Sequence, residues 1–169
     1  RPHFERMSFH VNVEADSAGT VTTEATVKLR VKDGVRHEVA EGDGPVNALD
    51  GALRRALAKS FPQLKKVTLT DYKVRVLDFK KGTAARVRVL IEWSDHRRSW
   101  ATVGVSENVI EASWFALVDA MRLELTGESE DDIAAEINRT TTRPAVQVNA
   151  KVDPTRFNEF LAGGMDALM

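Results

Sequence analysis

The fold is decided by residues 21–61, which read VTTEATVKLRVKDGVRHEVAEGDGPVNALDGALRRALAKSF. Over residues 21–31 apolar and polar side chains alternate, which is the period of a half-buried strand. Asp33-Gly34 suits a two-residue hairpin turn, so residues 35–39 are predicted to return as a second strand. From Pro45 the apolar residues recur three and four apart as far as Phe61, which predicts an amphipathic helix that ends before Pro62.

One more strand is predicted before this stretch, and the whole order of elements is predicted to repeat after it. Before it, Phe9, Val11 and Val13 alternate with polar residues and predict a first strand. After it, residues 67–77, 85–93 and 100–104 predict three more strands, Ser106 suits a helix N-cap, and residues 110–121 carry a helical apolar stripe. The two predicted helices match when the first is shifted along the sequence by one constant number of residues. Asn47, Leu49, Leu53 and Leu57 then fall on Asn108, Ile110, Trp114 and Val118.

The plan is therefore βββα twice. We predict an α+β fold in which duplicated βββα units place two helices on antiparallel sheet, each sheet keeping one face open to a partner. Duplicated units of this kind favour a symmetric homodimer. Residues 1–125 are interpreted as this duplicated domain. Residues 126–169 are interpreted as a polar linker with a short helical C-terminal tail that begins at Asp153-Pro154.

Composition excludes several classes of protein. The 169 residues hold 24 Lys+Arg and 25 Asp+Glu, so no basic excess indicates a nucleic-acid partner or an anionic membrane. The chain has no cysteine, which removes disulfides and thiolate chemistry. We expect no membrane span and no secretion signal, and therefore a cytoplasmic protein with a packed core.

No constellation of residues predicts catalysis or a metal site. His3, His10, His37 and His96 lie far apart and lack metal-ligand spacing. Asp71 beside Tyr72 is the nearest candidate for an acid or base, and we interpret it as an ordinary strand-end or edge position. We expect no catalysis, no metal and no cofactor in this chain.

The turn before the first helix is the best candidate for binding. Gly42-Asp43-Gly44-Pro45 leads into a helix start, where free N–H groups and the helix dipole favour an anion such as a carboxylate. The alternative is that glycine only permits a tight strand-to-helix turn. The second repeat has a related turn at residues 104–108. Two such starts would suit a small carboxylate ligand, for example an amino acid.

Four segments together resemble a known family. They are residues 42–48 (GDGPVNA), 69–77 (LTDYKVRVL), 82–89 (GTAARVRV) and 102–114 (TVGVSENVIEASW). In this order they resemble the C-terminal regulatory domain of the 2-isopropylmalate synthase and (R)-citramalate synthase family. The resemblance covers about Phe4 to Leu125 and favours the citramalate synthase branch.

The resemblance implies a function. That branch condenses pyruvate with acetyl-CoA in a metal-containing TIM barrel and is inhibited by isoleucine, whereas the isopropylmalate branch is inhibited by leucine. The barrel and its metal motifs are absent from these 169 residues. The resemblance therefore implies a homodimeric sensor domain that binds an effector amino acid, isoleucine or leucine, and partners a catalytic barrel of the same or another chain.

The resemblance also assigns effector-binding positions. Gly42, Asp43, Gly44 and Asn47 match the family's ligand-proximal loop and helix start. Tyr72, Val76 and Thr83 match positions lining the pocket, and Glu107, Asn108 and Val109 match the corresponding loop of the second unit.

Three functional hypotheses remain open at this stage. The first is an allosteric domain that binds a branched-chain amino acid, isoleucine favoured, as a feedback inhibitor. The second is a dimerisation and docking domain without effector binding. The third is an enzyme in its own right, for which the sequence offers no acid, base, nucleophile or metal constellation.

Overall fold

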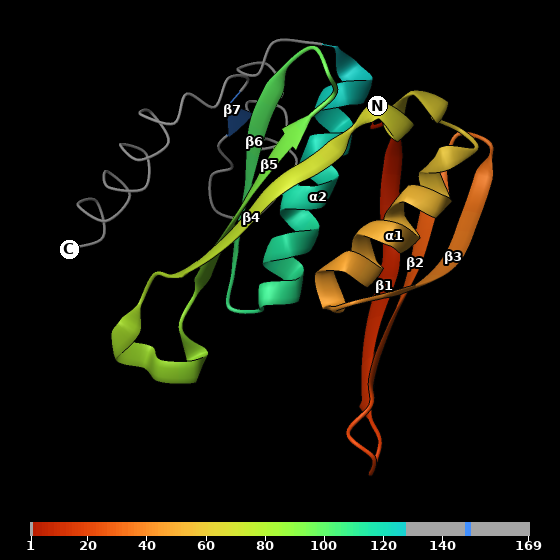
Figure 1. Cartoon of the computed structure of the whole chain (residues 1–169). Helices are drawn as coiled ribbons and strands as arrows, with labels where there is room; N and C mark the ends of the chain where they lie inside the picture. The colour runs from red at the N-terminus through yellow and green to blue at the C-terminus, as the bar shows by residue number, and fades with distance from the viewer. Residues whose placement is uncertain (1, 128–147, 150–169) are drawn as a thin grey trace. The chain divides into compact units, whose positions relative to one another are not determined.

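The computed structural model describes residues 2–127 and 148–149 and divides the chain into two compact units, Arg1–Lys65 and Lys66–Met169 (Figure 1). Unit 1 contains β1 (Phe4–Ala15), β2 (Val21–Val31), β3 (Gly34–Gly42) and α1 (Pro45–Ala58), and the short 3₁₀ helix η1 (Pro62–Lys66) runs across the boundary. Unit 2 contains β4 (Thr68–Val76), η2 (Phe79–Ala84), β5 (Val87–Ser94), β6 (Ser99–Ser106), α2 (Val109–Thr126) and β7 (Val148–Asn149). The predicted α+β fold with two βββα units is confirmed.

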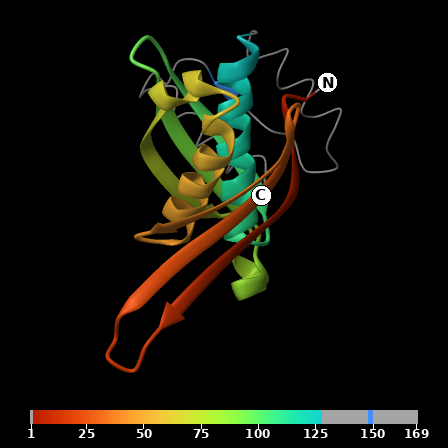
Figure 2. The same ribbon diagram turned by 90° about the vertical axis from the view of Figure 1, so that its right-hand side faces the viewer.

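In unit 1 the sheet has the order β1-β2-β3 with antiparallel neighbours, and α1 packs on β2 and β3. The alternation predicted in β2 is confirmed. From Thr23 onward its side chains on the α1 side are buried, namely Thr23, Ala25, Val27, Leu29 and Val31. The hairpin of β1 and β2 runs on past the start of α1 (Figure 2). Val13 and Val21 therefore stay 53% and 61% exposed.

In unit 2 the sheet has the order β4-β5-β6-β7, again with antiparallel pairs. A buried relay ties this sheet to α2. The Trp93 indole N–H donates to Thr102 Oγ1 at 2.9 Å, and the Thr102 hydroxyl donates to the carbonyl oxygen of Ala116 at 2.7 Å. The relay satisfies polar atoms that would otherwise be costly in a core of large apolar side chains.

A glycine brings helix and sheet together in each unit. A Cβ built on Gly42 would clash with the backbone nitrogen of Ala48, and one on Gly104 would clash with the carbonyl oxygen of Ala112. The first turn of each helix thus rests directly on the third strand of its unit. No side chain fits at this contact.

The two helices correspond when their first residues, Pro45 of α1 and Val109 of α2, are aligned. The predicted alignment of Asn47 with Asn108 is therefore wrong. Counted from the helix starts, buried alanines coincide, with Ala48, Ala52 and Ala56 matching Ala112, Ala116 and Ala120. The turn between Gly104 and α2 is longer than the turn between Gly42 and α1, which displaces the match.

Two predicted helix boundaries need correction. α1 starts at Pro45 as predicted but ends at Ala58, ahead of Phe61. α2 is capped by Asn108 and not by Ser106. It ends at Thr126, where Gly127 adopts the left-handed conformation with φ +58°.

The division at residue 125 stays a prediction. β7 is an element that the sequence analysis did not predict, and it pairs Asn149 with Ala101 and Val148 with Thr102 of β6. The short helix predicted to begin at Asp153-Pro154 lies outside the described residues.

We predict that Gly104→Ala lowers the free energy of unfolding by about 3 kcal/mol, the upper end of the usual cost of overpacking, because the new methyl group meets backbone atoms of α2. Gly44→Ala is the matched control, since nothing lies within 4 Å of its added Cβ. Urea denaturation monitored by tryptophan fluorescence measures both. Equal stability of the two variants would contradict the close contact at Gly104.

Candidate functional site

The start of α1 leaves backbone donors open. Gly44 is the N-cap and offers no side-chain cap, and Pro45 at the first helical position has no N–H to donate. The Ala48 N–H donates to the Gly44 carbonyl oxygen at 3.0 Å. Among the described residues, the backbone N–H groups of Val46 and Asn47 have no partner. These two donors lie at the positive end of the α1 dipole, where an anion is stabilised.

The four predicted residues of unit 1 lie together around this helix start. Asp43 donates its backbone N–H to Asn47 Oδ1 at 3.1 Å, which closes the turn against the first helical turn. The Asp43 side chain is exposed, as is Asn47. The space beside the Gly44 Cα is open to 4 Å.

An apolar strand accompanies the open helix start. The register of the sheet places Val13, Thr23 and Gly42 in one cross-strand row. Val13 lies on the same side of the sheet as α1 because it is opposite Thr23, yet it remains 53% exposed. Unit 1 thus combines open N–H donors, an exposed carboxylate and exposed apolar surface near one end of α1.

The six predicted residues of unit 2 come from β4, η2 and the turn into α2. Tyr72 and Val76 share the face of β4 that α2 partly covers, and Val76 is 37% exposed. Val76 is in a row with Val87 and Ser106, just ahead of Glu107, Asn108 and Val109. Thr83 lies exposed in η2. The assignment of these residues, and of those in unit 1, to an effector site stays a prediction.

The start of α2 differs from that of α1. Asn108 Oδ1 accepts the backbone N–H groups of Ile110 at 2.8 Å and Glu111 at 3.2 Å. Ser106, the expected cap, instead accepts the Asn108 N–H at 3.1 Å and donates its hydroxyl proton to Glu111 Oε2 at 2.7 Å. The first turn of α2 is therefore occupied by its own side chains.

The Tyr72 hydroxyl lies against α2. Its oxygen is 2.9 Å from Ser113 Oγ, while the Ser113 hydroxyl is 2.7 Å from the Val109 carbonyl oxygen. Because a carbonyl oxygen can only accept, Ser113 donates to Val109 and Tyr72 donates to Ser113. Sequence analysis singled out Tyr72 but missed Ser113, which the spacing from Asn108 could have placed in the first turns of the helix.

The acidic residues show no arrangement of an acid and a base. The hydrogen bond from Lys73, 2.7 Å away, lowers the pKa of Asp71, so this carboxylate is an ion-paired surface group. Burial raises the pKa of Asp50, and the charge and hydrogen bonds of Arg54 oppose that rise. Over residues 2–127 and 148–149, no group of three or more His, Asp or Glu side chains could hold a metal ion. None of the described helices is long and apolar enough to cross a bilayer.

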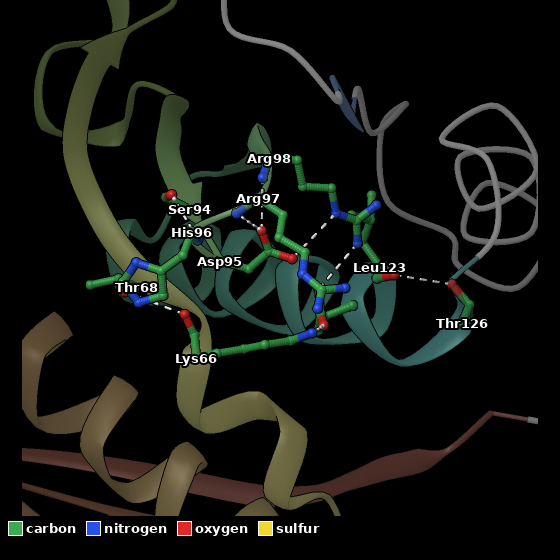
Figure 3. Close-up of polar contacts among 10 residues, drawn as sticks. Lys66, Thr68, Ser94, Asp95, His96, Arg97, Arg98, Leu123 and Thr126 are labelled. Atoms are coloured by element: carbon green, nitrogen blue, oxygen red, sulfur yellow. Dashed lines mark hydrogen bonds and ion pairs between the residues drawn. The ribbon is translucent and has the colours of Figure 1, made fainter.

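An ionic network in unit 2 was missed by sequence analysis (Figure 3). Glu124 of α2 has a side chain only 5% exposed and binds Lys66 at 2.8 Å and Arg98 at 3.1 Å. Asp95 accepts the backbone N–H groups of Arg97 and Arg98, each at 2.9 Å. The network fixes the β5–β6 turn to the last turns of α2, and its members come from elements that no short motif connects.

Comparison with known proteins identifies relatives. The family model described as "LeuA allosteric (dimerisation) domain" matches residues 2–124. An (R)-citramalate synthase from Aquifex aeolicus is 53% identical over 112 residues, covering 66% of this chain and 21% of that protein. A second, from Geobacter sulfurreducens, is 53% identical over 108 residues, covering 64% and 20%. A 2-isopropylmalate synthase from Shewanella amazonensis is 33% identical over 111 residues, covering 66% and 20%. The chain spans about a fifth of the length of these relatives.

We predict that Tyr72→Phe and Ser113→Ala each lower the free energy of unfolding by about 1 kcal/mol, the usual net contribution of one hydrogen bond. The loss of stability in the double variant should be smaller than the sum of the two single losses, because both single changes remove the same contact. Urea denaturation of the four proteins measures this coupling. Fully additive losses would show that the two hydroxyl groups do not interact.

We predict an acid-sensitive contribution of Asp95 to stability. Burial would raise its pKa, but hydrogen bonds from the Arg98 and Arg97 backbone and the charges of Arg98 and Lys66 outweigh burial, so the pKa lies below 3.8. A lowered pKa in the folded state stabilises the fold above the unfolded value, and this contribution is lost as pH falls through the folded pKa. Asp95→Asn should therefore destabilise the protein at pH 7. It should also reduce the loss of stability between about pH 4 and about pH 2, the range just below the ordinary pKa of an aspartate.

Unfolding curves at several pH values test this contribution, with Asp33→Asn in the exposed hairpin turn as the control. An Asp95→Asn variant with the parent's pH dependence would contradict the role of Asp95.

Proposed function

The chain belongs to the LeuA allosteric (dimerisation) domain family, and on that premise we propose that it binds a branched-chain amino acid as the feedback inhibitor of a citramalate or isopropylmalate synthase. Isoleucine is the effector we favour, because the relatives at 52–54% identity are named (R)-citramalate synthases. The catalytic domain under control is a TIM barrel of the same or another chain. This chain itself contributes regulation and dimer formation.

The observation that carries the proposal is the open first turn of α1. An amino acid brings a carboxylate, an ammonium group and an aliphatic side chain. The N–H groups of Val46 and Asn47 can receive the carboxylate, the exposed Asp43 carboxylate can receive the ammonium group, and exposed valine surface can receive the side chain. The three chemical requirements of this ligand are thus matched in one unit.

The second candidate function is a dimerisation and docking domain that does not bind an effector. Exposed valines on both first strands favour it, because Val13, Val74 and Val76 are 53%, 45% and 37% exposed on the helix side of their sheets. Exposed apolar surface of this kind suits a second copy of the chain. Both candidates therefore include a homodimer.

We predict that calorimetric titration of the purified chain with isoleucine shows saturable binding, with leucine and valine weaker. A change of one methyl position in an apolar pocket is worth about 1–3 kcal/mol, so the preference should be roughly 10-fold or more. Oligomeric mass is measured on the same sample. A well-folded dimer that gives no heat and no thermal stabilisation with any of the three amino acids would refute effector binding and favour the docking function.

Gly44→Val should weaken isoleucine binding at least about 10-fold, which corresponds to roughly 1.4 kcal/mol, because a branched side chain would fill the open space beside the helix start. The chain conformation at Gly44 is extended, so valine fits there without strain. Thr22→Val, an exposed position on β2, is the matched control. Unchanged affinity in the Gly44 variant would move the effector away from α1.

A further inference from the structure

An apolar cluster lies on the face of the second sheet that is turned away from α2. It consists of Leu90 on β5 and Ala101, Val103 and Val105 on β6, and we call it the rear-face cluster. Leu90 and Val103 are directly opposite each other in the register of the two strands. Their neighbours Thr102 and Gly104 contact α2 on the other face, and successive side chains of a strand alternate between faces.

The rear-face cluster is covered. Leu90 and Ala101 are each 2% exposed and Val103 is 5% exposed, although these side chains lie opposite the helix-covered face. In the stretch from Lys66 to Gly127, α2 is the single α-helix, and it packs on the other side of the sheet. A surface other than α2 therefore buries this cluster.

β7 shows where the chain returns to this sheet. Val148 and Asn149 pair with Thr102 and Ala101, so they lie at the outer edge of β6. β6 is the strand that supplies most of the rear-face cluster, and Ala101 belongs to both the pairing and the cluster. Asn149 thus pairs with a residue of the covered cluster, and residues 150–169 follow it in the sequence.

This segment has a suitable sequence and sufficient length. Phe157, Phe160 and Leu161 recur at spacings of three and four, which in the helix predicted from Asp153 would place them on one side. A helix of ten residues is about 15 Å long, whereas the cluster spans two strands only about 5 Å apart. The charged part of the rear face lies farther from β7, on β4 and β5, where Lys73 binds Asp71 and Glu92.

We propose that residues 150–169 of the same chain dock on the rear-face cluster through Phe157, Phe160 and Leu161, with β7 as their anchor. The tail then completes unit 2 by closing the second face of its sheet. It also protects β6, because an edge strand beside exposed apolar side chains invites pairing with other chains. The C-terminal segment is, on this proposal, an integral layer of unit 2.

Thiol labelling of the full chain tests the proposal. The chain has no cysteine, so Val103→Cys introduces a single thiol into the cluster, and Thr22→Cys introduces one at an exposed position of unit 1. We expect the thiol at 103 to react with maleimide at least 10-fold more slowly than the thiol at 22. Replacing Phe157, Phe160 and Leu161 together by Asp should raise the rate at 103 at least 10-fold and leave the rate at 22 unchanged.

The matched control replaces Thr155, Asn158 and Ala162 by Asp, which adds the same charge on the other side of the predicted helix. This variant should keep the slow rate at 103. Equal rates in the two triple variants, fast labelling of the parent at 103, or a rate at 103 that rises only on dilution to the monomer would each overturn the proposal. The last outcome would assign the cover to a second copy of the chain.

A second position keeps the test valid if Val103→Cys does not fold. Val105 is partly buried at the rim of the cluster, so Val105→Cys perturbs the sheet less. Paired with Leu161→Cys, it should form an intrachain disulfide on oxidation, detected as a faster-migrating monomer. Paired with Ala162→Cys, it should do so at least 10-fold less. Equal disulfide yields from the two pairs would also contradict docking through Leu161.

Discussion

In each unit the first turn of the helix rests on the third strand with no room for a side chain between them. Gly42 and Gly104 make this possible, because a methyl group at either position would enter the backbone of the helix. The contact fixes where each helix lies over its sheet. Alanines facing the sheet, Ala48, Ala52 and Ala56 in α1, keep the remaining turns close. A helix held at this position covers the second and third strands and leaves part of the first strand bare, which is why Val13 and Val74 are exposed on the helix side.

The bare first strands leave apolar surface uncovered on the helix side of each sheet. Burial of apolar surface is worth about 25 cal/mol per Å², so exposed valines represent binding energy that the units do not use internally. Both proposed functions would cover this surface, one with a second copy of the chain and the other also with an aliphatic ligand. Tyr72 limits the exposed part of unit 2, because its hydroxyl donates to Ser113 and holds the ring against α2. From Val74 onward the face of β4 is open.

The features that depend on a local period could be predicted from the sequence. Alternation in residues 21–31 predicted the buried face of β2, and Pro45 predicted the start of α1. Features that depend on distance between elements could not. Asn108 and Ser106 are both good capping residues, and only the path of the turn decides that Asn108 caps the helix. The longer turn after Gly104 moves the start of α2 along the chain relative to that of α1, which comparison at a fixed offset cannot detect. The pairing of Glu124 with Lys66 and Arg98 joins distant segments that only the folded unit brings together.

The two helix starts have diverged in a way that bears on where an anion binds. At α2 an incoming carboxylate would have to displace Asn108, whose carboxamide oxygen already accepts two N–H groups, and loss of such a cap costs about 1 kcal/mol. At α1 no cap has to be displaced, since Gly44 has no side chain. The two starts therefore differ, since α2 is capped by the Asn108 side chain whereas α1 has no side-chain cap. A ligand shifts a conformational equilibrium only by its different affinities for the two states. An effector at α1 would therefore act only if the protein has two states that differ in the conformation of the turn from Gly42 to Asn47. The hydrogen bond from the Asp43 N–H to Asn47 Oδ1 lies within that turn, so it is the contact expected to differ between the two states.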